Sequence, residues 1–103
     1  MSISVKAAIT AVGGYVPETK LTNFDLEKIV DTNDEWIRTR TGIEERRILR
    51  EPGKASSDMA VKAIEEILRK KNLDPLEIEC IICATVTPDM VFPATANIIG
   101  DKV

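Results

Sequence analysis

The sequence of 103 residues contains no histidine, only two cysteines and few aromatic residues. Histidine is the side chain whose unperturbed pKa lies nearest to neutrality, so its absence removes the usual general base and a common metal ligand. These residues alone therefore cannot form a Ser-His-Asp or Cys-His catalytic site, or a histidine-ligated zinc or iron site. We predict no metal site.

Long apolar runs are also lacking. No run reaches the roughly 18 residues that a membrane-spanning helix needs. The first residues alternate apolar and polar side chains and have no continuous apolar core of a signal peptide. Two cysteines do not make a disulfide framework. We therefore expect a cytoplasmic location and no contact with membranes.

The charge is mildly acidic, with a formal net charge of −3, which argues against general nucleic-acid binding. Basic residues nevertheless gather between positions 38 and 54, where six stand against three acidic residues. Any anion-binding site is expected there. Within this segment Arg46, Arg47 and Arg50 could extend a phosphate-attracting surface, although such runs more often form a solvated face.

Two segments are predicted to form strands. Residues 3–11 alternate apolar and polar side chains with a period of two, which is typical of a strand. Residues 78–86 form a nearly unbroken apolar run of strand length, which indicates a strand buried on both faces. Residues 43–50 are expected to be extended. Gly13-Gly14 ends the first segment but lacks the spacing of a dinucleotide-binding fingerprint.

Several helices are predicted from their ends. Thr22 with Asp25, and Thr32 with Glu35, each have the spacing of a capping box, and Gly42 is expected to end the second helix. A longer helix begins at Ser56 or Ser57 and ends near residue 72. A last helix runs from Pro93 to Gly100. The alternation of strands and helices indicates an α/β layered fold.

Thr32, Trp36 and Arg40 are spaced by four residues and are expected to share one helical face. An indole ring can stack on a planar heterocycle while a guanidinium group binds phosphate oxygens, so the pair would suit a nucleotide with a phosphate tail. Alternatively, Trp36 packs in the core with Arg40 beside it, and Thr32 is only a cap. Spacing alone favours the second interpretation, because tryptophan is highly buried on average.

Cys80 and Cys83 match the C-x-x-C spacing of redox and metal sites. On a strand, however, residues three apart point to opposite faces, and zinc would need further ligands that the chain does not supply. We therefore interpret both as buried structural thiols. Phe92 is either a core residue or one that is offered to a pocket or a partner, and its spacing does not decide between them.

Longer motifs resemble the β-ketoacyl-acyl-carrier-protein synthase III family over essentially all 103 residues. The motifs that carry the resemblance are GYVP (14–17), TNFDLE (22–27), VDTNDEWI (30–37), RTGI (40–43), Arg46-Arg47, ATVTPD (84–89) and Phe92-Pro93. One departure is Asn33, where the family usually has serine. The resemblance implies an α/β fold that is part of a thiolase-like layered αβαβα sandwich, in a protein that is usually a homodimer.

The family starts fatty-acid chains by joining an acyl-CoA primer, often acetyl-CoA, to malonyl-acyl-carrier protein with loss of carbon dioxide. It needs no prosthetic group. The resemblance implies that Trp36 stacks on the adenine of coenzyme A, that Thr32 hydrogen-bonds near it and that Arg40 meets the phosphates. It also implies that Phe92 reaches across the dimer interface. The resemblance therefore favours the interpretation in which Trp36 and Arg40 bind a ligand over the one in which Trp36 packs in the core.

None of the family's catalytic residues, a cysteine, a histidine and an asparagine, matches a position in this chain. We therefore expect residues 1–103 to be the N-terminal part of a synthase half that holds the coenzyme A contacts and is inactive alone, since the condensation needs a covalent thioester and an oxyanion site. The alternative is a non-catalytic fragment that binds coenzyme A or self-associates through exposed strand edges.

Overall fold

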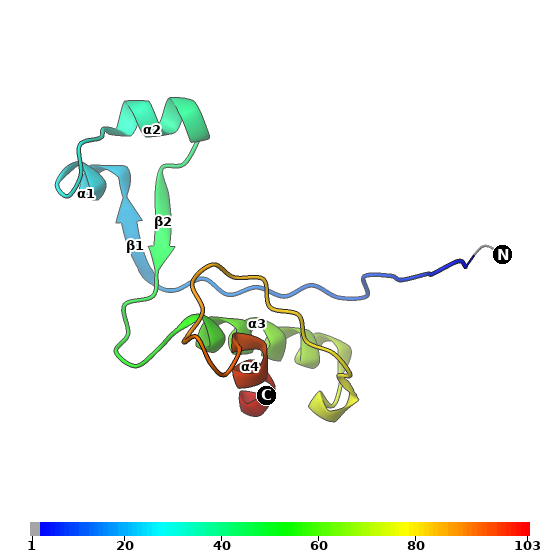
Figure 1. Ribbon diagram of the computed structural model, residues 1–103. Helices are drawn as coiled ribbons and strands as arrows, with labels where there is room; N and C mark the ends of the chain where they lie inside the picture. Colours follow the sequence, from blue (N-terminus) through cyan, green and yellow to red (C-terminus); the bar gives the residue numbers. More distant parts are fainter. Residues whose placement is uncertain (1–2) are drawn as a thin grey trace. The chain divides into compact units, whose positions relative to one another are not determined.

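The structure, a computed structural model, describes residues 3–103 and divides into two compact units. The hairpin unit comprises Val16–Ala55, and the helical unit comprises the residues up to Tyr15 together with Ser56–Val103. Figure 1 shows the elements of both units in chain colours. No helix within residues 3–103 is long and apolar enough to cross a membrane.

The hairpin unit is built on two short antiparallel strands. β1 (Thr19–Thr22) pairs with β2 (Glu45–Ile48), with Thr19 opposite Ile48 and Thr22 opposite Glu45. Helices α1 and α2 lie between them in sequence, at the same end of the strand pair (Figure 1). The extended conformation expected at residues 43–50 is confirmed at β2, whereas β1 was not predicted.

The two helices of this unit begin and end at local signals. α1 (Asn23–Glu27) begins with the predicted capping box of Thr22 and Asp25. α2 (Asp34–Thr41) ends at Gly42 as predicted, where φ of 72° is readily adopted by glycine. The predicted start of α2 is wrong, because its N-cap is Asn33 and not Thr32. The Asn33 side chain accepts a hydrogen bond from the backbone N–H of Trp36 at 2.8 Å.

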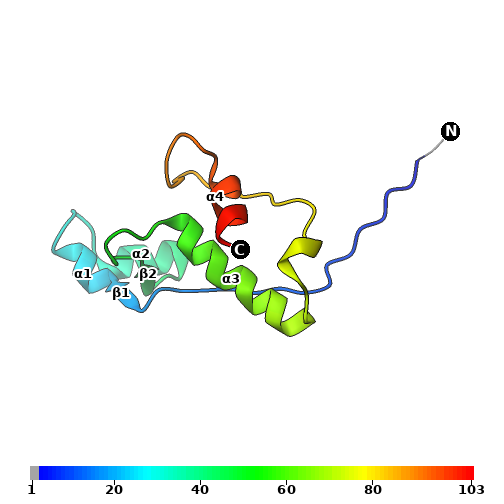
Figure 2. The same cartoon turned by 90° about the horizontal axis from the view of Figure 1, so that it is seen from below.

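The helical unit consists mainly of two packed helices. α3 (Ser56–Lys71) is followed by a short 3-10 helix, η1 (Pro75–Glu77), and by α4 (Thr95–Lys102). α4 lies beside α3 in both views (Figures 1 and 2) and buries Ile99 almost completely. The prediction for α4 was displaced by two residues, since the helix begins after Pro93 and continues past Gly100.

Both strands predicted in the helical unit are wrong for this structure. Residues 3–11 and 78–86 are assigned to no strand, and Ile9 and Ile82 are 88% and 90% exposed. A strand requires a hydrogen-bonded partner, and within residues 3–103 neither segment is paired with another strand. Both segments therefore have the apolar pattern of a strand without the pairing that a strand needs.

Candidate functional site

Trp36 and Arg40 form the most distinctive contact on the surface of α2. The Trp36 ring is 52% exposed, which overturns the interpretation that it packs in the core. One helical turn later, the guanidinium carbon of Arg40 lies 4.7 Å from the centroid of the indole ring. At an exposed position such a cation–π contact contributes about 0.5–1 kcal/mol. It fixes a cation beside a flat, accessible ring.

Thr32 lies close to Trp36, but not on the helix. It is half-buried and precedes the Asn33 cap, and its N–H donates to the carbonyl of Val30 at 2.9 Å. Thr32 and Trp36 both line a hollow of about 160 Å³, together with Asp31 and Asn33. The expected helical stripe of three is therefore wrong for Thr32, while the turn before α2 still brings it beside the indole. We call Thr32, Trp36 and Arg40 the Trp36 site.

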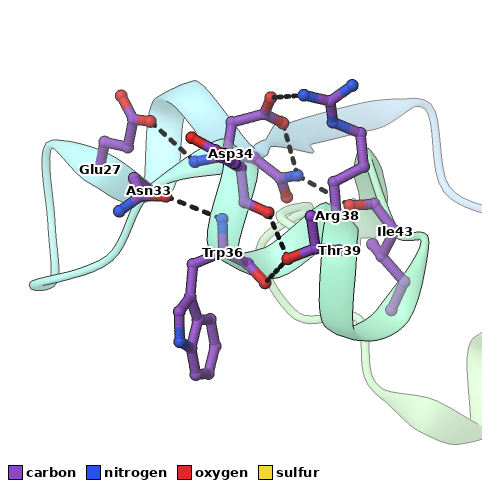
Figure 3. Close-up of polar contacts among 9 residues, drawn as sticks. Glu27, Asn33, Asp34, Trp36, Arg38, Thr39 and Ile43 are labelled. Carbon is purple, nitrogen blue, oxygen red and sulfur yellow. Dashed lines mark hydrogen bonds and ion pairs between the residues drawn. The ribbon is translucent and has the colours of Figure 1, made fainter.

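The opposite side of α2 carries a different set of groups. Figure 3 shows the Trp36 ring pointing away from Asp34 and Arg38, which form an ion pair at 3.2 Å. A larger hollow of about 450 Å³ opens beside this pair, and its lining consists of Thr22, Phe24, Asp34, Arg38, Glu44 and Glu45. Three carboxylates against one guanidinium repel an anionic ligand. The phosphate chemistry expected in the basic segment therefore suits the Trp36 face better.

Two other arginines of the basic segment, Arg46 and Arg47, have internal roles. Arg46 donates to the carbonyl of Leu21 at 3.2 Å and to the side chain of Asn23 at 3.0 Å. Arg47 donates to the carbonyl of Pro17 at 2.9 Å. Both guanidinium groups therefore brace the strand pair, and the structure does not bring them to the Trp36 site.

A buried asparagine, Asn23, contacts both ends of α2 and was not predicted from the sequence. Asn23 is fully buried, and its amide donates to Asp34 Oδ1 at 2.8 Å and to the carbonyl of Ile43 at 2.7 Å. Asp34 is the first residue of α2, and Ile43 follows its cap. No spacing signal marks Asn23, because Thr22 already caps the helix in which Asn23 lies.

The remaining singled-out residues lie in the helical unit. Phe92 is 85% exposed, so it is not a core residue in the part of the chain that the structure describes. Cys83 is half-buried and Cys80 is exposed, so the expectation of two buried thiols is wrong for Cys80 and only partly met at Cys83; both are free. Among residues 3–103 no group of three or more potential side-chain ligands could hold a metal ion.

No family model matches the chain. Individual proteins do match it, both in sequence and in structure. Its sequence is 56% identical over 97 residues to β-ketoacyl-[acyl-carrier-protein] synthase III of Chlorobium luteolum, which covers 94% of this chain and 30% of that protein. The synthase III of Caldanaerobacter subterraneus is 56% identical over 99 residues, covering 96% of this chain and 30% of that protein. The chain thus spans about 30% of the length of these curated relatives.

Solved structures match in the same way. The 3-oxoacyl-[acyl-carrier-protein] synthase III of Aquifex aeolicus superposes with a TM-score of 0.80 at 54% identity, covering 88% of this chain and 29% of that one. The synthase III of Thermus thermophilus gives 0.80 at 46% identity, covering 93% and 30%. The priming β-ketosynthase of the R1128 polyketide pathway gives 0.78 at 34% identity, covering 88% and 27%.

The solved structures show the fold class of the chain: it is α/β and part of a thiolase-like fold, as predicted. The recognition made from the motifs is also confirmed. Over the part that it spans, the chain belongs to the β-ketoacyl-[acyl-carrier-protein] synthase III family.

Proposed function

We propose that these residues supply the coenzyme A contacts of a β-ketoacyl-acyl-carrier-protein synthase III. The observation that carries the proposal is the Trp36–Arg40 pair, in which a guanidinium lies 4.7 Å from the centroid of a half-exposed indole. Adenine stacks on indole, and a guanidinium binds phosphate oxygens through two parallel hydrogen bonds. Thr32, in the adjoining hollow, offers a hydroxyl to the adenine.

The proposed reaction is the initiating condensation of fatty-acid synthesis. An acyl-CoA primer, often acetyl-CoA, is joined to malonyl-acyl-carrier protein, and carbon dioxide is released. Acyl-CoA is a substrate in this scheme, and no prosthetic group takes part. The names of the matched relatives support this reaction. The cytoplasmic location remains a prediction.

Residues 1–103 are proposed to be inactive by themselves. The reaction needs a cysteine nucleophile with histidine and asparagine partners, and the chain has no histidine. Purified chain mixed with acetyl-CoA and malonyl-acyl-carrier protein is expected to give no ketoacyl product above the enzyme-free control. Product formation would show that other groups of the chain can perform the condensation.

We further propose that the complete protein pairs with a second copy, with Phe92 near the interface. The 85% exposure of this ring supports the placement. A second candidate function is self-association without catalysis, which the exposed apolar side chains of Ile9, Ile82 and Val86 favour. Sedimentation over a range of concentrations, combined with a coenzyme A titration, separates the two functions, because self-association as the sole function predicts oligomers that do not bind coenzyme A.

Coenzyme A binding is tested by fluorescence titration. Trp36 is the only tryptophan of the chain, so emission reports on this site alone. Coenzyme A is expected to quench it, and Arg40→Ala is expected to weaken binding about tenfold through loss of a charge-assisted hydrogen bond. Arg38→Ala is the matched control, because it removes the same charge from the opposite side of α2 (Figure 3). Unchanged emission, or equal losses in both variants, would refute the proposal.

A further inference from the structure

One buried amide reaches both ends of the helix that carries Trp36 and Arg40. Asn23 Nδ2 donates to Asp34 Oδ1 at 2.8 Å, at the start of α2, and to the carbonyl of Ile43 at 2.7 Å, just after its end. Both amide hydrogens of Asn23 are thereby used on α2 and its exit. Figure 3 shows Asp34 and Ile43 at the two ends of this helix.

The side-chain oxygen of Asn23 contacts the strand pair. Asn23 Oδ1 accepts from Arg46 Nη2 at 3.0 Å, and Arg46 Nη1 donates to the carbonyl of Leu21 at 3.2 Å. The Asn23 N–H also donates to the carbonyl of Glu44 at 3.0 Å. A continuous chain of hydrogen bonds therefore runs from β1 and β2 through one fully buried side chain to α2.

Apolar packing gives α2 little other support. The helix has eight residues, and helices of this length are marginal without tertiary contacts. Ile37 is the only residue of α2 that is buried. Hydrogen bonds in a buried setting are directional and costly to leave unmade. Polar contacts therefore hold α2 in place: the Asn23 network at both ends of the helix, and the Asp34 N–H, which donates to Glu27 Oε1 at 2.9 Å.

We infer that Asn23 is a positioning residue for the Trp36 site: by tying both ends of α2 to the strand pair, it fixes where the indole and the Arg40 guanidinium meet coenzyme A. This inference rests on the proposed function for its ligand. Asn23 lies beneath the helix, and Figure 3 shows Trp36 pointing away from the Asp34 end of the network. Asn23 therefore acts through α2 and does not contact the ligand.

The test uses an exchange of side chains of equal size. Asn23→Asp replaces the donating nitrogen by an oxygen that faces Asp34 and the Ile43 carbonyl, so the attraction becomes repulsion. Coenzyme A affinity, read from Trp36 fluorescence, is expected to fall about tenfold, and amide hydrogens of α2 are expected to exchange about tenfold faster. Asn97→Asp makes the same chemical change at an exposed position of α4 and serves as control.

A second variant distinguishes positioning from general destabilisation. Adding Asp34→Asn to Asn23→Asp restores a donor and an acceptor between these positions in the reverse direction. Affinity and α2 protection are both expected to recover by about threefold or more relative to the single variant. A double variant that is unfolded, or that folds without regaining both properties, would overturn the inference.

The outcomes for the two proposals are separable. If wild-type chain gives no response to coenzyme A, the proposed function fails, and the inference is then decided by hydrogen exchange of α2 alone. If wild-type chain binds and Asn23→Asp binds equally well with unchanged protection of α2, the proposed function stands and the positioning role of Asn23 is refuted.

Discussion

Ser57 donates both its backbone N–H and its hydroxyl to the carboxylate of Asp89, and the N–H bond measures 2.9 Å. Ser57 is fully buried in the first turn of α3. Its hydroxyl also accepts from Lys102 Nζ at 2.8 Å, at the end of α4. The loop residue Asp89 is thereby joined to both helices of the helical unit.

Asp89→Ala is expected to destabilise the helical unit by about 2 kcal/mol, because it leaves buried polar groups of Ser57 without their charged partner. Urea unfolding followed by circular dichroism measures this change. Asp101→Ala, an exposed position on α4, is the control and is expected to change stability by less than about 0.5 kcal/mol. Equal stability of the two variants would show that the Ser57–Asp89 contact is not a stabilising one.

The neighbouring glycines 13 and 14 are predicted to differ sharply in their tolerance of alanine. A Cβ atom on Gly13 would lie 2.5 Å from the carbonyl oxygen of Ala63 and 2.8 Å from Ile67, whereas one on Gly14 would meet nothing within 4 Å. Gly13→Ala is therefore expected to cost about 1–3 kcal/mol and Gly14→Ala much less.

Hydrogen exchange at residue 14 gives a local measure, because the Gly14 N–H donates to Glu66 at 3.0 Å. Faster exchange in Gly13→Ala, with near wild-type exchange in Gly14→Ala, is the expected result. If both variants protect this amide equally, the chain does not approach α3 as closely as the structure places it.

The carboxyl of Glu66, on α3, is predicted to hold the segment around Gly14 in a pH-dependent way. Hydrogen bonds from Lys70 and then from the Gly14 N–H lower the pKa of Glu66 below its ordinary value of 4.5. Because the folded-state pKa is depressed, the stabilisation is fully present above pH 4.5 and is lost as the pH falls through the lower value.

Carboxyl NMR titration measures this effect directly. In Lys70→Met the pKa of Glu66 is expected to rise toward 4.5, because the first of the two donors is removed. Arg69→Met is the comparison, since Arg69 acts on Glu66 only as a weaker nearby charge. A pKa that is the same in wild type and Lys70→Met would contradict the contact.

Asn33 is predicted to stabilise α2 as its cap. Its side chain accepts the Trp36 N–H at 2.8 Å, so Asn33→Ala is expected to cost about 1 kcal/mol. Asn33→Ser is expected to stay within a few tenths of a kcal/mol of wild type, because serine caps helices about as well. Thermal unfolding of wild type and the two variants measures these differences. Equal losses of stability in both variants would exclude capping by the Asn33 side chain.

Local signals predicted the helix ends well. Thr22 with Asp25, and Gly42 at the end of α2, act within a few residues, so the sequence contains most of what fixes them. Asn33 took the cap predicted for Thr32 because adjacent polar residues compete for the same N–H groups. The spacing of Trp36 and Arg40 likewise predicted their contact, since residues four apart on a helix are neighbours.

Long-range pairing could not be predicted in the same way. β1 was missed because its partner lies more than twenty residues away, and residues 3–11 and 78–86 have strand patterns without a partner in the part described. Asn23 was missed because its side-chain partners lie 11, 20 and 23 residues along the chain. Patterns of neighbouring residues contain no information on such contacts.

The central claim is that coenzyme A binds at the Trp36 site. The most direct measurement is a two-dimensional ¹⁵N NMR titration of the chain with coenzyme A up to roughly millimolar concentration. We predict that the largest shifts occur at the Trp36 indole N–H, the Arg40 side chain and the Thr32 amide. No shift at these groups, or shifts confined to α3 and α4, would contradict the claim.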